Sequence, residues 1–134
     1  MDVEFFVDNN FGAGLVRALR ELGFSNVEHL TEKFPEDTED EIWLKYVGEN
    51  RMALITKDKK IRYNPKEKDA LVRYKVVAFY LQGSEMGARA TTLQLVNGWE
   101  KMEAKAAVQL KKGVACAFSV RRGGGGKLAV IPLT

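Results

Sequence analysis

Four acidic side chains stand at positions where their carboxylates could bind a metal ion. Asp8 follows one apolar run and Asp58 follows another, while Asp40 and Glu41 lie shortly before the second run. Two carboxylates about 5 Å apart repel each other by roughly 3 kcal/mol at an effective dielectric of about 20. Such acids stay together only if protons or a cation neutralise them. A hard dication does this best, and Mg²⁺ suits a site with few protein ligands and several retained waters.

Other kinds of catalytic site lack the residues that they need. The chain has a single histidine, His29, and a single cysteine, Cys116, which are too few and too far apart for a zinc site of normal ligand spacing. A Ser/His/Asp arrangement would have only His29 as its base. The glycine run at residues 123–126 precedes Lys127 and Leu128, without the serine or threonine that a phosphate-binding loop requires. We therefore expect His29 and Cys116 to be structural.

The segments that must position the carboxylates alternate between strand and helix patterns. Apolar, β-favouring runs predict strands over residues 3–7, 26–30, 52–56 and 76–81. Between them, helices are predicted over about 9–22, from 38 to about 50, from 64 onward, and from 84 to about 111, where Asn97 and Gly98 could kink or split the last one. Residues 114–120 and 128–131 should form a closing hairpin.

Polar residues mark where these helices should begin. The expected caps are Asn9 or Asn10, Thr38 in a capping box with Glu41, Asn64 followed by Pro65 with Glu67 in a capping box, and Ser84. Helical spacing predicts these buried faces: Phe11, Leu15, Ala18, Leu19 and Leu22; Ile42, Trp43, Tyr46 and Val47; Met86, Ala90, Leu93, Val96, Trp99, Met102 and Ala106.

Alternating strands and helices predict an α/β fold with a doubly wound, mainly parallel sheet, helices on both faces and an antiparallel hairpin at one edge. Ligands of such sheets gather beyond the carboxyl ends of the strands. If the strands before Asp8 and Asp58 are neighbours, all four acids face one crevice.

Composition and length favour one domain over residues 1–134. The chain has 134 residues, of which 46% are hydrophobic, enough to bury roughly two thirds of the unfolded surface. Residues 1–8 lack a basic region, so we expect neither a signal nor a transit peptide. No apolar run approaches the roughly 20 residues that span a bilayer. The single cysteine fits a reducing compartment, and we expect a cytoplasmic protein without membrane contact.

Charge is unevenly distributed along the chain, although the formal net charge is only +3. Residues 28–41 contain seven acids and one lysine, whereas residues 57–75 contain eight bases and three acids. An acidic region beside a basic one would fit a cation site next to a groove for a polyanion, and solvated surfaces produce the same pattern. Both interpretations stay open at this point.

Four short segments together form a recognisable series. They are Val-Asp-Asn-Asn at 7–10, Leu-Arg-Glu-Leu-Gly at 19–23, Thr-Glu-Asp-Glu-Ile-Trp at 38–43 and Ile-Thr-Lys-Asp at 55–58. This series resembles the compact PIN-like domains related to the VapC toxins of bacterial and archaeal toxin–antitoxin pairs. The resemblance covers about residues 3 to 62. It implies a three-layer α/β/α PIN-like fold with a mainly parallel sheet and, here, a C-terminal β-hairpin.

The resemblance also implies which residues act. An aspartate ending the first strand corresponds to Asp8, an acid opening the helix before the third strand to Asp40, and the Thr-x-Asp motif supplies Asp58. These three would be catalytic and, with Glu41 as the adjacent candidate, would hold Mg²⁺ or Mn²⁺. Larger PIN domains carry a further glutamate on a segment that this chain is too short to contain. Glu67 could replace it if its helix turns inward; otherwise Glu67 is a capping-box residue.

What the resemblance implies about function is metal-dependent hydrolysis of RNA, most like a toxin that an antitoxin protein holds inactive. Homodimers are common among such relatives. Lys57, Lys59, Lys60 and Arg62 would hold the phosphates of the RNA, or would simply form a solvated face. Arg121, Arg122 and Lys127 are a second candidate contact. Two other functions stay open: an inactive PIN-like module that binds RNA or protein, and a receiver-like phosphoacceptor domain.

Overall fold

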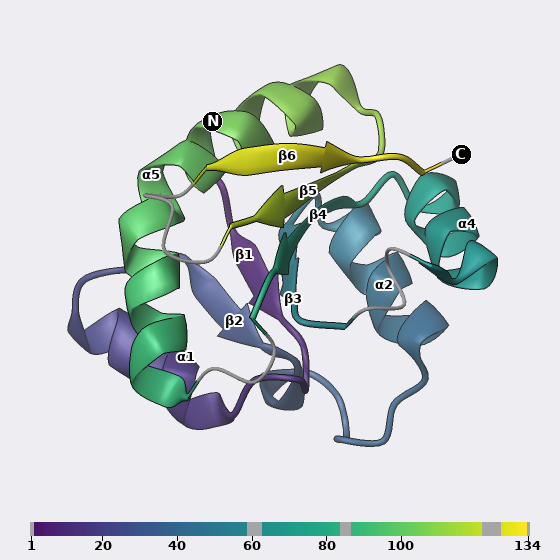
Figure 1. Cartoon of the computed structure of the whole chain (residues 1–134). Coiled ribbons are helices and arrows are strands. Elements are labelled where there is room, and N and C mark those ends of the chain that lie inside the picture. Colours follow the sequence, from purple (N-terminus) through teal and green to yellow (C-terminus); the bar gives the residue numbers. More distant parts are fainter. Residues whose placement is uncertain (1, 59–62, 84–86, 122–126, 134) are drawn as a thin grey trace.

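The alternation of apolar residues along the central strands builds two cores, one on each face of a six-stranded sheet. Figure 1 shows the computed structural model, which describes residues 2–58, 63–83, 87–121 and 127–133. The strands lie in the order β2-β1-β3-β4-β5-β6, and all neighbouring pairs are parallel except β5 and β6. Their bounds are β1 Phe5–Val7, β2 Val27–His29, β3 Ala53–Thr56, β4 Val77–Leu81, β5 Cys116–Val120 and β6 Leu128–Ile131.

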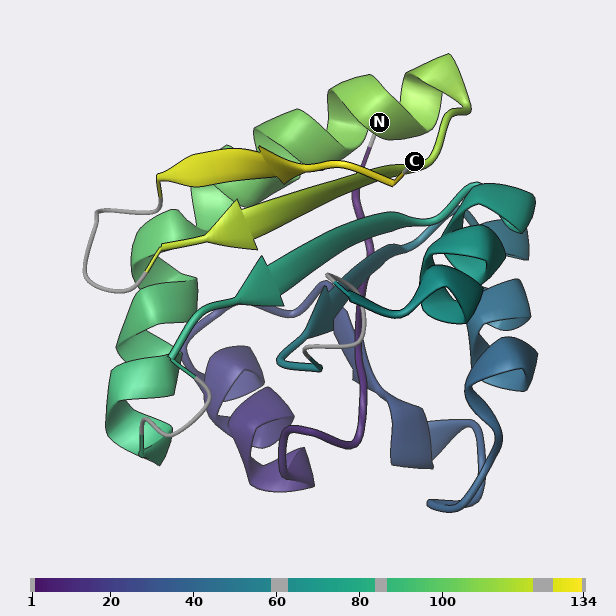
Figure 2. The same ribbon diagram turned by 45° about the vertical axis from the view of Figure 1, so that its right-hand side comes forward.

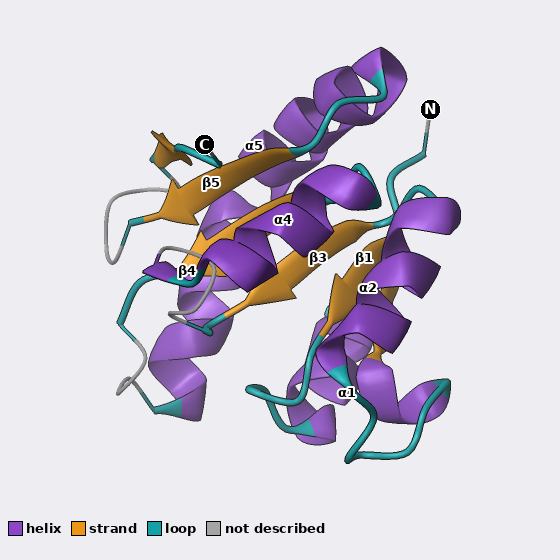
Figure 3. Ribbon diagram, turned by 90° about the vertical axis from the view of Figure 1, so that its right-hand side faces the viewer, coloured by secondary structure: helices purple, strands orange, loops and turns teal. Residues whose placement is uncertain are grey.

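Helices cover both faces of this sheet. One face packs against α1 (Ala13–Glu21) and the long helix α5 (Ala88–Lys112), and the other packs against α2 (Asp40–Glu49) and α4 (Pro65–Arg73). A short 3₁₀ turn, η1 (Leu30–Glu32), follows β2. Seen from the side of α2 and α4, these two helices lie in front of the strands while α5 lies behind them (Figure 3). The prediction of a three-layer α/β fold with a mainly parallel sheet and a C-terminal hairpin is confirmed.

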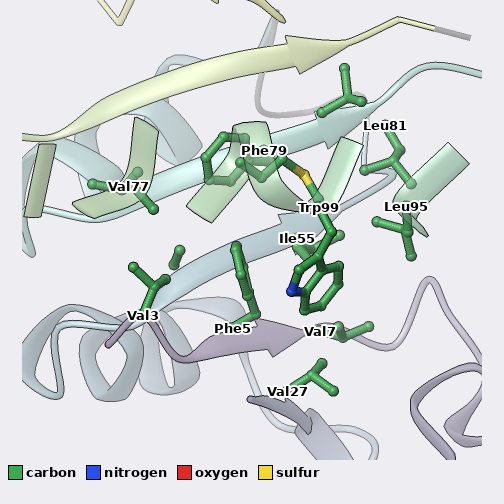
Figure 4. Packing of buried hydrophobic residues seen from close by; sticks show 14 of the residues in the cluster. Val3, Phe5, Val7, Val27, Ile55, Val77, Phe79, Leu81, Leu95 and Trp99 are labelled. Carbon is green, nitrogen blue, oxygen red and sulfur yellow. The ribbon is translucent and has the colours of Figure 1, made fainter. Parts of the chain in front are cut away.

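Trp99 is the largest side chain of the core beneath α1 and α5. Its ring lies 4.7 Å from that of Phe5 and 5.3 Å from that of Phe24, centroid to centroid. Figure 4 shows it among side chains of β1, β3 and β4. On the other face, Phe6 stacks on Trp43 at 5.7 Å. Successive residues of β1 therefore pack against helices on opposite faces of the sheet. This packing fixes the position of β1 and of Asp8, which follows it.

Two predicted helix starts were wrong. The first helix begins at Ala13 with Gly12 as its N-cap, because Asn10 instead donates two hydrogen bonds to Asp8. The second helix has Glu39 as its N-cap, without a side-chain cap, because the Thr38 hydroxyl donates to the carbonyl of Pro35 at 2.7 Å. Asn64 does cap its helix by accepting from the Lys66 N–H at 2.9 Å. Ser84 and Met86 lie outside the described residues, and α5 has Gly87 at its N-cap.

Five side chains assigned to buried helix faces are exposed, namely Ala18, Leu22, Ile42, Ala90 and Leu93. Leu22, Ile42 and Leu93 are 62%, 53% and 54% exposed. Fewer residues of each helix pack against the sheet than the sequence pattern predicted, because the sheet covers only part of the circumference of a helix. The helix α5 also runs unbroken through Asn97 and Gly98, the latter being buried. Among the described residues, no helix combines the length and apolar character that crossing a membrane requires.

Candidate metal centre

The register of the two central strands brings Asp8 and Asp58 to the same end of the sheet. Strand β1 pairs in parallel with β3, with Val7 opposite Ile55. The next residue on β3, Thr56, therefore lies beside Asp8, and its hydroxyl donates to Asp8 Oδ2 at 2.5 Å. The same hydroxyl accepts a hydrogen bond from the N–H of Asp58 at 2.9 Å. One threonine thus sets the relative position of both carboxylates.

Asp8 is a buried carboxylate, with only 3% of its surface exposed. Burial raises its pKa to about 6, and the negative charge of Asp58 adds to this. Hydrogen bonds from Thr56 and from the N–H and side-chain amide of Asn10 lower it in part, at 2.5, 3.0 and 3.3 Å. A carboxylate that is hard to ionise in this environment is one that a nearby cation would hold in its charged form.

Three further acids converge beside Asp8. Carboxylate oxygens of Asp40, Asp58 and Glu67 lie within 4.8 Å of one another, and all three residues are half-buried. Asp40 is the first residue of α2, and Glu67 lies in the first turn of α4. Both helices therefore direct the positive ends of their dipoles toward the acids, which offsets part of their mutual repulsion.

A pocket of about 180 Å³ connects Asp8 with Asp40 and Asp58. Asp8, Asp40 and Asp58 line it together with Asn9, Asn10, Leu30, Glu36, Thr38 and Trp43. The charged side chains among its described lining residues are carboxylates, and hard divalent cations such as Mg²⁺ prefer oxygen ligands. The donor set therefore fits a magnesium-like ion with room for water. A soft-metal site is not supported by the described residues of this pocket, which include neither cysteine nor histidine.

Glu41, the fourth predicted ligand, is directed elsewhere. Its Oε1 accepts from Arg73 Nη1 at 2.7 Å and from the hydroxyl of Tyr74 at 3.0 Å. Both contacts join α2 to the end of α4 on the exposed surface. The structure therefore brings Asp8, Asp40 and Asp58 together, places Glu67 with them, and leaves Glu41 outside their pocket.

Glu67 was considered mainly as a capping-box residue, and it lies in the first turn of a helix that Asn64 caps. No sequence signal distinguished the two roles, because both place an acid in the first turn. The deciding factor is the packing of α4 on the sheet, which turns Glu67 toward Asp40 and Asp58.

Of the four predicted RNA contacts around Asp58, Lys57 alone lies among the described residues, since Lys59, Lys60 and Arg62 fall outside them. Its Nζ donates to Thr91 Oγ1 at 3.2 Å and lies 5.1 Å from the centre of the Phe11 ring. Partial burial lowers its pKa. Lys57 is thus held between the end of β3 and α5, in a second pocket that shares Asn10 with the acidic pocket.

His29 has a structural role. The N–H of Thr31 donates to His29 Nδ1 at 3.1 Å, so Nδ1 is an acceptor and the proton resides on Nε2, which donates to the carbonyl of Phe11 at 2.7 Å. This bond ties the end of β2 to the loop that follows Asp8. His29 therefore supports the loop that carries Asp8 and Asn10.

The comparison with protein families agrees with this geometry. A family model described as a PIN-like domain matches residues 3–83, which is more than half of the chain and contains Asp8, Asp40, Asp58 and Glu67. The chain belongs to the PIN-like domain family, whose members are often nucleases and typically bind divalent metals. No curated protein and no solved structure matches the chain. The family is thus established, and its acidic cluster is present at the carboxyl ends of β1 and β3.

Proposed function

We propose that this protein is an endoribonuclease that depends on Mg²⁺ or Mn²⁺ and hydrolyses RNA phosphodiesters in the acidic pocket. One observation carries the proposal: three carboxylates from separate elements lie within 4.8 Å of one another, beside a fourth that is buried. Carboxylates held this close repel one another unless protons or a cation neutralise them. Membership of the PIN-like family supports the choice of nuclease over other metal-dependent hydrolases.

The roles of the residues follow from their positions. Asp40, Asp58 and Glu67 bind the ion. The buried carboxylate of Asp8 adds a further negative charge next to it. When bound, the ion supplies an activated water and charge stabilisation at the phosphate. Thr56 and Asn10 hold Asp8 still, so the pocket is preorganised. Lys57, which directly precedes Asp58, is proposed to attract a flanking phosphate, and Lys59, Lys60 and Arg62 are proposed as further contacts from the sequence alone.

We further propose that the nuclease is the toxin of a type II toxin–antitoxin pair, similar to VapC toxins, acting in the cytoplasm. The support is the resemblance of residues 3 to 62 to that branch. An antitoxin protein would mask the acidic pocket, and a homodimer is the proposed assembly. An adjacent short reading frame that encodes a DNA-binding protein, whose product forms a complex with this chain and blocks RNA cleavage, would support the pairing.

The direct test is RNA cleavage by the purified protein with and without divalent metal. We expect cleavage in Mg²⁺ or Mn²⁺, none in EDTA, and a loss of at least about 100-fold in Asp8→Asn and in Asp58→Asn, as for removal of other preorganised charges. Glu41→Gln is the matched control, because it also removes one carboxylate near α2 but outside the pocket.

Two other functions give different results in the same assay. RNA binding without cleavage in any metal would indicate an inactive PIN-like module. Labelling of an aspartate by acetyl phosphate, abolished in Asp8→Asn, would indicate a receiver-like phosphoacceptor. Cleavage that survives in both Asp8→Asn and Asp58→Asn would refute the proposed active site.

A further inference from the structure

A second concave surface lies on the part of the chain that the family model does not match. It has a volume of about 730 Å³ and lies between α5 and the hairpin of β5 and β6. Its lining residues are Lys101, Ala104, Lys105, Val108, Arg121, Lys127, Leu128 and Ala129, which we call the hairpin groove. Among the described residues, none lines both this groove and the acidic pocket. In Figure 1 and Figure 2, β6 runs beside the carboxyl-terminal half of α5.

The charge of the hairpin groove is of one sign. Four of its described lining residues are lysine or arginine, and none is acidic. Two acids of α5, Glu100 and Glu103, are next in sequence to lining residues; neither lines the groove, and Glu103 accepts a hydrogen bond from Asn26 Nδ2 at 3.0 Å and lines a different pocket. The four cations surround a floor of aliphatic side chains, in which Val108 is 51% exposed. An anionic ligand with apolar groups is complementary to such a surface.

Strand β6 offers main-chain hydrogen bonds along the same groove. It is the last strand of the sheet, so one side of it pairs with no other strand in the described ranges. The N–H of Arg121 donates to the carbonyl of Lys127 at 3.1 Å, and hydrogen-bonded pairs alternate along an antiparallel ladder. The main-chain groups of Leu128 and Val130 therefore point away from β5.

The side chains of this edge are unusual for a strand exposed to water. Leu128 packs partly against the core beneath α5, whereas Val130 is 70% exposed. Edge strands that face solvent are commonly protected by charges, proline or bulges. Here Leu128 and Val130 have apolar side chains, and their main-chain N–H and C=O groups point away from β5. A peptide that adds a strand to a sheet binds to an edge of this kind.

We propose that the hairpin groove binds an extended, acidic segment of a partner protein, which adds a strand to β6. Its main chain pairs with Leu128 and Val130. Its acidic side chains reach Lys105 and Lys127, and its apolar side chains cover Val108. The proposal does not depend on whether the acidic pocket cleaves RNA.

Two other occupants fit the groove less well. RNA would find cations there, but the described lining offers no aromatic ring for stacking and no side-chain amide or carboxylate for reading bases. A second copy of this chain, paired β6 to β6, would bring two sets of basic residues together, which like-charge repulsion opposes. A peptide supplies both the opposite charge and the missing main-chain partners.

The test measures how a short, fluorescently labelled peptide binds to the whole protein in EDTA. Along one face of the extended peptide, glutamate and valine take turns at every second residue, and threonine stands between them. We expect saturable binding with a Kd below about 1 mM. A peptide with lysine in place of glutamate should bind at least about tenfold more weakly, because the cations then repel it. The double variant Lys105→Glu, Lys127→Glu should lose binding of the acidic peptide to a similar extent.

The main-chain part of the proposal has its own variant and control. Val130→Pro removes the outward N–H, and proline is tolerated at edge positions that do not pair inward. It should abolish binding, whereas Val130→Thr, which keeps the N–H and the β-branched shape, should retain it. Circular dichroism checks that both variants fold.

Three results would overturn the proposal: no saturable binding of the acidic peptide, equal binding by the charge-reversed protein, or tighter binding of single-stranded oligouridylate than of the peptide with competition between them. Self-association that Val130→Pro abolishes would also overturn it, in favour of a second copy. Loss of RNA cleavage in the metal assay would leave the peptide result unchanged, so the two proposals fail separately.

Discussion

Thr56 and Asp8 are joined by a hydrogen bond of 2.5 Å between the ends of neighbouring strands. Because Thr56 also accepts from the N–H of Asp58, its hydroxyl is the link between a buried acid and a half-buried one. Both groups depend on one oxygen atom. The threonine of the Thr-x-Asp motif therefore positions the two aspartates, in addition to being part of the strand.

Replacing that oxygen should weaken the fold and the site together. In Thr56→Val the shape is kept, but Asp8 loses a donor and the N–H of Asp58 loses its acceptor, for which we expect a loss of about 1–3 kcal/mol in the free energy of unfolding. Urea unfolding in EDTA measures it. Thr56→Ser, which keeps the hydroxyl, should lose clearly less. Equal stability of the valine variant and the wild type would contradict the assigned role.

The burial of Asp8 predicts a pH dependence of stability in the metal-free protein. Its pKa rises from 3.8 to about 6 on folding, so the folded state holds the proton more tightly than the unfolded state. Below about pH 4 both states are protonated and nothing is lost; as pH rises through about 6, the ionised carboxylate destabilises the fold by up to about 3 kcal/mol.

Asp8→Asn should remove the loss of stability that the ionised Asp8 causes as the pH rises. Measured in EDTA by urea unfolding, the stability of the variant relative to the wild type should increase between about pH 4 and pH 7 by an amount of that order. The difference between the two proteins cancels the other titrating groups. If the difference in unfolding free energy between the two proteins stays constant over this range, the pKa of Asp8 is not raised by burial.

Metal affinity should distinguish Glu67 from Glu41. Glu67→Gln removes one of three carboxylates within 4.8 Å of one another, and should weaken Mn²⁺ binding by about tenfold or more, since affinity follows the ligand charge. Titration calorimetry or the paramagnetic resonance of free Mn²⁺ measures it. Glu41→Gln should change the affinity by less than about twofold, because that carboxylate binds Arg73 instead. A larger loss of affinity in Glu41→Gln than in Glu67→Gln would show that Glu41, and not Glu67, binds the metal.

Two glycine-to-alanine changes inside helices should have opposite effects. A Cβ on Gly48 would lie 2.1 Å from the carbonyl oxygen of Tyr74, a backbone atom, so Gly48→Ala should destabilise the packing of α2 against α4 by about 1–3 kcal/mol. A Cβ on Gly14 meets only the end of Arg17 at 3.5 Å, and Gly14→Ala should stabilise α1 by about 0.5 kcal/mol. Thermal unfolding of both variants measures the contrast, and a stabilised Gly48→Ala protein would contradict the close helix contact.

Much of the architecture could be read from local patterns. Short apolar runs predicted the parallel strands because both faces of such strands are buried, and Asn64 before Pro65 predicted a helix start that the structure confirms. The Thr38 and Asn10 caps were wrong, because each side chain had a competing partner, Pro35 and Asp8, that only the folded chain brings near.

The sequence by itself determined that acids follow the ends of two apolar strands and that parallel strands end at one edge of a sheet. Asp8 and Asp58 could be placed together on that basis. The tertiary structure alone decided that Glu67 turns inward and Glu41 outward, since the rotation of a helix is set by the surface on which it packs. It also decided the burial of Asp8 and the exposed edge of β6, because burial and edges belong to the whole sheet and are encoded in no single segment.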